Sequence, residues 1–397
     1  MQIVLKDSKN DKKILSDPLT CLDPTQRSWI EVSGKAIENN VREIKSFLSK
    51  DCKFMAVVKA DGYGHDAKFI SDNAIKGGAD QLGVATLQEG LLLRSQGIGV
   101  PILVLGNLYC KGDLISCFKN DLMPTISDIR ACIACNDIGK EFHKQFLVHL
   151  KVDTGMSRLG FEPKRFIDSF KKILSFENIK LDGIYSHLAS ADDMNAHDDN
   201  SFANTQRKKF LKVLSDVKIE EQPSIKIHLA NSAATLLGSQ YHFDMVRVGL
   251  SMYGYNPLKI NTMLNLKPAL FLKSKVSFIR EINANIGVSY GQKFISDRKT
   301  KLAVISIGYA DGICRTLSNK ISLIHNGKMY PQIGAITMDQ LMIDITGAND
   351  INVGDTVILL GCDEGKSISP VDWASAASTI TWEILCSFKN RLPRVQI

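Results

Sequence analysis

The sequence predicts an α/β protein with an N-terminal (β/α)8, TIM-type barrel and a C-terminal mostly-β domain. In the first two thirds of the chain, short apolar runs alternate with helical patterns, as in parallel strands joined by crossover helices. After about Pro268 the apolar residues instead recur at every second position, which is typical of half-buried strands. A chain of 397 residues is long enough for two such domains.

The barrel is expected over residues 33–268. A helical pattern from Lys35 to Leu48 follows Ser33, a good N-cap residue, and Thr86 with Glu89 forms a capping box. Eight apolar runs provide the strand number that this barrel needs. They are Phe54–Val58, Leu82–Thr86, Ile102–Leu105, Met123–Ile126, Phe146–Val152, Gly183–Ser186, Ile225–Leu229 and Met245–Gly249.

The β domain is expected over residues 269–397. Its predicted strands are Leu272–Phe278, Lys301–Ile307, Ile321–Ile324, Gln340–Ile345 and Thr356–Leu360. Asn326-Gly327 is a type I′ hairpin signal, because both turn positions need a positive φ. The N-terminal segment, residues 1–32, contains a strand-like run, Trp29–Val32, that could pair with the β domain or with the barrel.

Composition excludes several classes of function. The net charge of +7 comes from scattered Lys and Arg, so no nucleic-acid partner is expected. No apolar run approaches a membrane span, and Met1–Leu15 lacks the apolar core of a signal peptide, so we expect a cytoplasmic protein without a membrane partner. The nine irregularly spaced cysteines indicate a reducing compartment. Cys132 and Cys135 form a lone C-x-x-C pair, so no metal site is expected.

The first chemically informative run is Phe54–His65, where a buried strand ends at Lys59 and a Gly-rich turn follows. Active sites of this barrel are built at the carboxyl ends of the strands. An ammonium ion there is costly to desolvate, which lowers the lysine pKa and leaves a free amine able to form a Schiff base. From position alone, a lysine that reaches out to solvent remains an open alternative.

Polar and cationic residues also follow four later strands. The loops after strands seven and eight are the usual phosphate site of this fold, and a helix N-terminus favours an anion. Strand positions therefore predict a phosphate site near the last two strands. The polar and cationic residues at the first two of these four strand ends are Lys151, Arg158 and His187, and those at the last two strands, where the phosphate is expected, are Asn231, Ser232 and Arg247, with Gly249 in the loop after the last strand.

Over nearly its whole length the sequence resembles the alanine racemase family. The motifs that carry the resemblance are the Lys59 run, Lys151–Gly160, Arg247–Gly254, Asn285–Gly291, Ile307–Gly312 and Thr337–Gln340. The resemblance implies an enzyme that uses pyridoxal 5'-phosphate (PLP) to racemise alanine, supplying D-alanine for the bacterial cell wall. It also implies a head-to-tail homodimer whose active sites each combine one barrel with the partner's β domain.

The resemblance further implies residue roles. Lys59 would hold the cofactor and act as one base, and Tyr290 of the partner subunit would act from the opposite face. Arg247 would lie against the pyridine nitrogen and would be coupled through His187 to that tyrosine. The cofactor site would comprise Lys59, Tyr63, His187, Asn231, Ser232, Arg247, Gly249 and Leu250, with Tyr309 of the partner subunit.

The substrate carboxylate would meet Arg158 and Met338 of the partner subunit, and Lys151 is a candidate for carbamylation. Asp192 and Arg315 would border the entrance. The sequence departs from well-known members in having Asn390 in place of a tyrosine and Ala335 in place of an arginine. Both side chains are shorter, so we hypothesise a wider entrance and some tolerance of serine.

Three alternatives remain beside alanine racemisation. The first is a racemase of broader specificity for small amino acids, serine included. The second is a PLP-dependent decarboxylase of basic amino acids, although such enzymes usually have a cysteine where Tyr290 stands. The third is a non-enzymatic PLP carrier, which is typically a bare barrel without a β domain.

Overall fold

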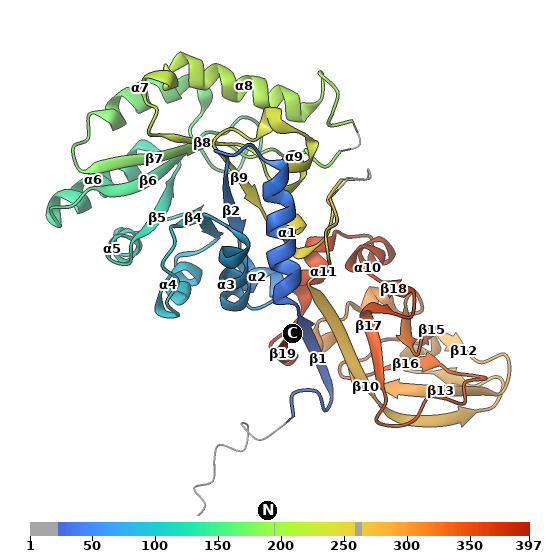
Figure 1. Cartoon of the computed structure of the whole chain (residues 1–397). Helices are drawn as coiled ribbons and strands as arrows, with labels where there is room; N and C mark the ends of the chain where they lie inside the picture. Colours follow the sequence, from blue (N-terminus) through green and yellow to red (C-terminus); the bar gives the residue numbers. More distant parts are fainter. Residues whose placement is uncertain (1–22, 194, 259–263) are drawn as a thin grey trace, which may run out of the picture.

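The computed structural model describes residues 23–193, 195–258 and 264–397, so most of the N-terminal segment, residues 1–22, lies outside the described residues. Two large sheets organise the chain (Figure 1). One is formed by strands of the first 250 residues and is surrounded by helices, and the other is formed mainly by strands after residue 269. The predicted fold class is therefore confirmed.

The first sheet is an eight-stranded parallel barrel with the order β8-β7-β6-β5-β4-β3-β2-β9. Its edges close through two backbone hydrogen bonds, from Asp244 N to Ile227 O and from Arg247 N to Ala230 O, at 3.0 Å each. Every predicted barrel strand is present. The strands are β2 Lys53–Val57, β3 Gln81–Val84, β4 Ile102–Asn107, β5 Leu122–Ile126, β6 Phe146–Lys151, β7 Ile179–Tyr185, β8 Lys226–His228 and β9 Met245–Val248.

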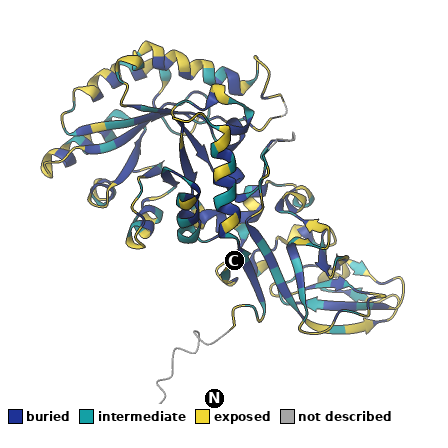
Figure 2. Ribbon diagram, in the orientation of Figure 1, coloured by how far each residue is buried: buried dark blue, intermediate teal, exposed yellow. Residues whose placement is uncertain are grey.

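Helices cover the outside of the barrel, and Figure 2 shows their buried faces turned toward it. Ser33 caps α1 by accepting a hydrogen bond from Ala36 N, and the Thr86–Glu89 capping box opens α4, so both predicted caps are confirmed. The helices are α1 Gly34–Phe47, α2 Lys59–Gly64, α3 Ala67–Gly77, α4 Leu87–Ser95, α5 Lys111–Lys119, α6 Ile129–Glu141, α7 Pro163–Leu174, α8 Phe202–Asp216 and α9 Ser232–Leu237. None of the helices described is both long and apolar enough to cross a membrane.

The second sheet has the order β18-β17-β14-β15-β16-β13-β10-β1-β19. Asn326 and Gly327 adopt φ values of 45° and 68° between β14 and β15, which confirms the predicted hairpin. The Trp29–Val32 run lies in β1, which pairs with β10 and β19 of this sheet. The strands are β1 Ser28–Val32, β10 Leu270–Ile282, β13 Thr300–Ile305, β14 Ser322–His325, β15 Lys328–Ile333, β16 Leu341–Asp344, β17 Thr356–Asp363, β18 Lys366–Ile368 and β19 Arg394–Gln396, with the small pair β11 Gly287–Val288 and β12 Phe294–Ile295 beside them.

The C-terminal end of the chain returns to the barrel. Two helices, α10 Pro370–Ala377 and α11 Thr381–Ser387, precede β19, and α11 lies beside α2 (Figure 1). Arg394 Nε donates to Gly64 O at 3.1 Å, which ties β19 to the turn that follows Lys59. The end of the chain therefore supports the barrel loop with the candidate Schiff-base lysine.

This turn has an unusual backbone. Four consecutive residues, Ala60 to Tyr63, have φ values between 53° and 60°, and three of them are not glycine. Left-handed geometry costs roughly 1–2 kcal/mol per such residue. Supporting hydrogen bonds hold the turn, from Ala60 N to Glu89 Oε1 at 2.8 Å and from Ala67 N to Asp61 Oδ1 at 2.9 Å. Strain of this kind is concentrated at functional sites.

Candidate active site

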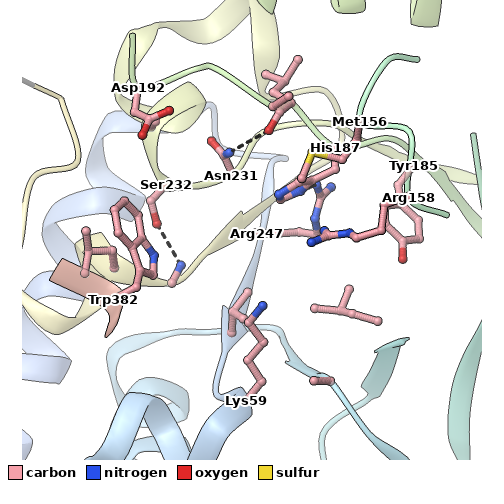
Figure 3. A pocket seen from close by; sticks show the side chains of 18 of the residues that line it. Lys59, Met156, Arg158, Tyr185, His187, Asp192, Asn231, Ser232, Arg247 and Trp382 are labelled. Atoms are coloured by element: carbon pink, nitrogen blue, oxygen red, sulfur yellow. Dashed lines mark hydrogen bonds between the residues drawn. The ribbon is translucent and has the colours of Figure 1, made fainter. Parts of the chain in front are cut away.

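A cavity of about 620 Å³ opens at the carboxyl ends of the barrel strands (Figure 3). It brings together every barrel residue that the sequence predicted for the site, whether as cofactor or substrate ligand, as the carbamylation candidate or at the entrance. These residues are Lys59, Tyr63, Lys151, Arg158, His187, Asp192, Asn231, Ser232, Arg247, Gly249 and Leu250. Among the residues described, no group of three or more His, Cys, Asp or Glu side chains is placed so that it could hold a metal ion.

The cavity is strongly cationic. Four cationic side chains line it, Lys59, Lys151, Arg158 and Arg247, while the one carboxylate among the described lining residues is Asp192. Burial, followed by the charge of Arg158, lowers the pKa of Lys59. Burial, followed by the charges of Arg247 and Arg158, lowers the pKa of Lys151 to about 8. The cavity therefore favours anionic ligands and makes both lysines better nucleophiles than exposed ones.

A buried polar cradle lies between α9 and β9. Ser232 Oγ accepts hydrogen bonds from Gly249 N at 2.9 Å and Ser251 N at 3.4 Å. A Cβ atom on Gly249 would lie 2.4 Å from Tyr63 Oη, so only glycine lets this hydroxyl approach the backbone. Hydroxyl and amide groups converging beside cations are suited to a phosphate group.

Arg247 lies on β9, lines the cavity and is 4% exposed. Its Nη2 donates to Ser186 O at 2.8 Å and to Leu229 O at 3.0 Å. Burial lowers its pKa to about 10, which still leaves the guanidinium charged at neutral pH. The side chain therefore offers a fixed positive charge to any ring or anion in the cavity.

His187 lies against this guanidinium, as Figure 3 shows, with its Nδ1 3.1 Å from Arg247 Nη2. A guanidinium can only donate, so His187 Nδ1 must accept and the ring hydrogen must be on Nε2. Burial and the charge of Arg247 lower the pKa of His187 well below its ordinary value. The imidazole is therefore neutral, with a donor at Nε2.

The predicted residues of the β domain do not line the cavity of their own chain. Tyr290 is 70% exposed, Met338 is 52% exposed and Tyr309 is 41% exposed, while Arg315 and Asn390 are also exposed. Tyr290 begins the short helix η5 (Tyr290–Gln292), beside Ser289 with a φ of 64°. Two sets of predicted residues are thus separated within one chain, one in the cavity and one on the β-domain surface.

Ala335 and Asn390, the two predicted departures, differ in their surroundings. Ala335 is fully buried, and its carbonyl accepts a hydrogen bond from Ser289 Oγ at 2.7 Å, next to Tyr290. Asn390 is exposed, between α11 and β19. The wider-entrance hypothesis therefore depends mainly on Asn390.

Sequence reasoning missed several lining residues. Ile380 and Trp382 come from α11 and the residue before it, near the C-terminal end of the same chain. Figure 3 shows Trp382 on the Ser232 side of the cavity. No local pattern reveals that this segment folds back onto the barrel. Tyr185 was also missed, although its place at the end of β7 was a usable signal.

Comparisons with known proteins match this arrangement. The sequence matches the family model "Alanine racemase, N-terminal domain" over residues 32–257 and "Alanine racemase, C-terminal domain" over residues 269–396. The chain belongs to the alanine racemase family. It is 51% identical to an alanine racemase of Prochlorococcus marinus over 383 residues, covering 96% of this chain and 99% of that protein.

Solved structures agree with the alanine racemase fold. One is the alanine racemase of Bacillus anthracis with bound L-Ala-P, at a TM-score of 0.85 and 34% identity, covering 94% of this chain and 95% of that one. Another is the alanine racemase of Bartonella henselae with covalently bound pyridoxal phosphate, at a TM-score of 0.84 and 31% identity, covering 94% of this chain and 99% of that one.

The cradle geometry leads to a first prediction. Gly249→Ala should weaken binding of inorganic phosphate at least about tenfold, because the new Cβ would displace the Tyr63 hydroxyl and disturb the Ser232 contacts. Isothermal titration calorimetry measures the affinity. Gly99→Ala is the matched control, since no atom lies within 4 Å of the added Cβ. Equal phosphate affinity in the two variants would show that the cradle is not the anion site.

Proposed function

We propose that the protein is a PLP-dependent racemase that interconverts L- and D-alanine in a homodimer with shared active sites. The observation that carries the proposal is the convergence of Lys59, Arg247 and the Ser232–Gly249 cradle on one cavity. Family membership and the relatives named alanine racemase support the reaction. The exposed Tyr290 supports a site that a second subunit completes.

The cavity residues suit the cofactor. Ser232, Gly249, Leu250 and Tyr63 would hold its phosphate, and Arg247 would face its ring nitrogen, with Asn231 beside them as the cap of α9. Bound PLP supplies an electron-withdrawing ring system that makes the α-hydrogen of an attached amino acid acidic. Arg247 keeps its own proton, so it would leave the ring nitrogen unprotonated and moderate this effect.

Two side chains would handle the α-proton. The Lys59 Nζ amine, with its lowered pKa, is suited to take or return a proton on one face of the substrate. Tyr290 Oη of the partner subunit would do the same on the opposite face. His187, with its hydrogen on Nε2, would donate to that oxygen and stabilise its deprotonated form. Arg158, with Met338 of the partner subunit, would orient the substrate carboxylate.

The proposed homodimer also assigns residues to the phosphate site and to the entrance. Tyr309 of the partner subunit would complete the phosphate site, and Asp192 with Arg315 of the partner subunit would border the entrance. We place the domain boundary at residue 268, between η4 (Leu250–Tyr253) and β10. We also propose a cytoplasmic location and a role in supplying D-alanine to the cell wall.

Subunit complementation tests the shared site. Lys59→Ala should abolish the visible cofactor absorbance and the conversion of L- to D-alanine, while Tyr290→Phe should keep the absorbance and lose racemisation by at least about 100-fold. Subunits of the two variants, mixed in equal amounts and allowed to exchange, should recover about a quarter of wild-type activity. Half of the dimers would then be mixed, and each would have one intact site.

The control is to mix two Tyr290→Phe preparations, which have no intact site to form. Restored activity only in the Lys59→Ala and Tyr290→Phe mixture supports a site shared between subunits. Full activity of Tyr290→Phe by itself would remove the second base from the mechanism, and an inactive wild-type protein would refute the racemase function.

Lys151 provides a pH-dependent prediction. A pKa of about 8 means that the neutral amine rises from about 1% at pH 6 to about half at pH 8. Neutral Nζ can add CO2 to form a carbamate with release of a proton, which turns a cation beside Arg158 into an anion. In 13C-labelled bicarbonate, the NMR signal of a protein carbamate should therefore be stronger at pH 8 than at pH 6.

The control variants separate Lys151 from other lysines. Lys151→Arg should lose the carbamate signal, whereas Lys180→Arg, at an exposed position of β7, should keep it. A signal that survives in Lys151→Arg would assign the carbamate to another amine.

Breadth of substrate is a second candidate feature, favoured by the short side chain of Asn390 at the predicted entrance. We expect a kcat/KM for L-serine within about 100-fold of that for L-alanine, since one added hydroxyl changes binding by only a few kcal/mol. Asn390→Tyr should lower the serine value more than the alanine value. A serine value several orders of magnitude below alanine in the unaltered protein would contradict the hypothesis.

A further inference from the structure

A line of hydrogen bonds runs through the barrel interior beneath the cavity and ends at Arg247. Asp182 Oδ2 lies 3.0 Å from His149 Nε2, and His149 Nδ1 lies 2.9 Å from His228 Nε2. His228 Nδ1 in turn lies 3.0 Å from Arg247 Nη1. Both imidazoles are fully buried. At the other end Lys226 Nζ contacts both carboxylate oxygens of Asp182 at 2.8 Å.

The donors and acceptors fix a single direction along this line. Arg247 can only donate, so His228 Nδ1 accepts and the hydrogen of His228 is on Nε2. That hydrogen is donated to His149 Nδ1, which leaves the hydrogen of His149 on Nε2, facing the Asp182 carboxylate. Burial lowers the pKa of both histidines, which keeps them neutral. The guanidinium at one end and the carboxylate at the other therefore favour the same pair of tautomers.

Local backbone features create space for this line. The pairing of β6 with β7 places Leu181 opposite Val148 and Gly183 opposite His149, so Asp182 is the extra residue of a β-bulge. Bulges of this kind redirect a side chain. A Cβ atom on Gly183 would lie 2.4 Å from His149 Nδ1, so the imidazole fits only because residue 183 is glycine.

Tyr185 packs against His228 and Arg247 of this line of hydrogen bonds. Its ring stacks on the His228 ring at 4.7 Å and 11°, and its hydroxyl is 2.8 Å from Thr125 Oγ1. The Arg247 guanidinium lies 5.0 Å from the same ring. His228 and Arg247 thus both contact the Tyr185 ring, which restricts how either can turn.

We propose that Asp182 and His149 are positioning residues of the active site, which act through His228 to hold the Arg247 guanidinium in one orientation toward the cavity. The role of Arg247 toward the cofactor rests on the proposed function, but the tautomers and the orientation of Arg247 do not. Without the carboxylate, His149 would lose the acceptor that fixes its tautomer. The opposite pair of tautomers would then become accessible, with a hydrogen on His228 Nδ1 facing the guanidinium, and Arg247 would have to move to accommodate it.

The first test uses the unaltered protein. Nitrogen-15 NMR of its eight histidines should show His149 and His228 neutral between pH 6 and 9, with the hydrogen on Nε2 in both. Assignment comes from His149→Gln and His228→Gln. A hydrogen on Nδ1 of His228 would overturn the proposal irrespective of how any variant folds.

The second test uses Asp182→Asn, which keeps the shape, removes the negative charge and can turn an amide N–H in place of an acceptor toward His149 Nε2. We expect a changed His228 tautomer signal, a shifted absorbance of the bound cofactor and a fall in kcat of about tenfold or more with little change in KM for alanine. Asp182→Glu restores an acceptor, so it should recover the tautomer signal and the absorbance.

Asp80→Asn is the matched control. Asp80 is another partly buried carboxylate, paired with Lys45 at 3.0 Å and accepting from Phe54 N at 2.8 Å, but it has no contact with the histidine line. It should lower stability without changing the His228 signal or the cofactor absorbance. Wild-type NMR signals, absorbance and kcat in Asp182→Asn would refute the positioning role. A wild-type protein that does not racemise alanine would instead refute the proposed function and leave the NMR result standing.

Discussion

The site depends on one buried cation. Arg247 is 4% exposed, and burying a guanidinium is costly unless all of its donors are satisfied. The structure offsets part of that cost with neutral acceptors for Nη1 and Nη2, the carbonyls of Ser186 and Leu229 and the Nδ1 atoms of His187 and His228. Because none of these acceptors is charged, the positive charge is not cancelled. It raises the affinity of the cavity for anions and helps to lower the pKa of Lys151.

The barrel topology explains why these residues meet. Parallel strands place their carboxyl ends at one edge, so Lys59 after β2, His187 after β7 and Arg247 on β9 face one cavity although far apart in sequence. Trp382 of the same chain covers part of the cavity. The exposed Tyr290 supports the proposal that a second subunit covers the remaining part. A head-to-tail dimer would satisfy both an open barrel mouth and an exposed β-domain surface.

The sequence was most informative where local rules govern. Apolar runs predicted all eight barrel strands, and Asn326-Gly327 predicted its hairpin, because both signals depend on neighbouring residues. Polar residues at strand ends predicted the barrel side of the cavity. Trp382 and Ala335 could not be placed in this way, since a return onto the barrel and burial beneath Ser289 depend on long-range packing. The predicted strand Gly183–Ser186 began too late, because Lys180 and Asp182 interrupt the apolar pattern of β7.

The charged residue Asp182 within β7 has a physical reason. A carboxylate placed directly beside Arg247 would neutralise its charge and weaken the attraction for an anionic ligand. Asp182 is instead separated from the guanidinium by two neutral imidazoles, His149 and His228, and its charge is balanced by Lys226 at the far end. The line therefore provides a directional acceptor for Arg247 while keeping the negative charge away from the cavity. A direct ion pair would fix the orientation of Arg247 and cancel its charge at the same time. In this barrel the orientation is fixed while the charge is kept.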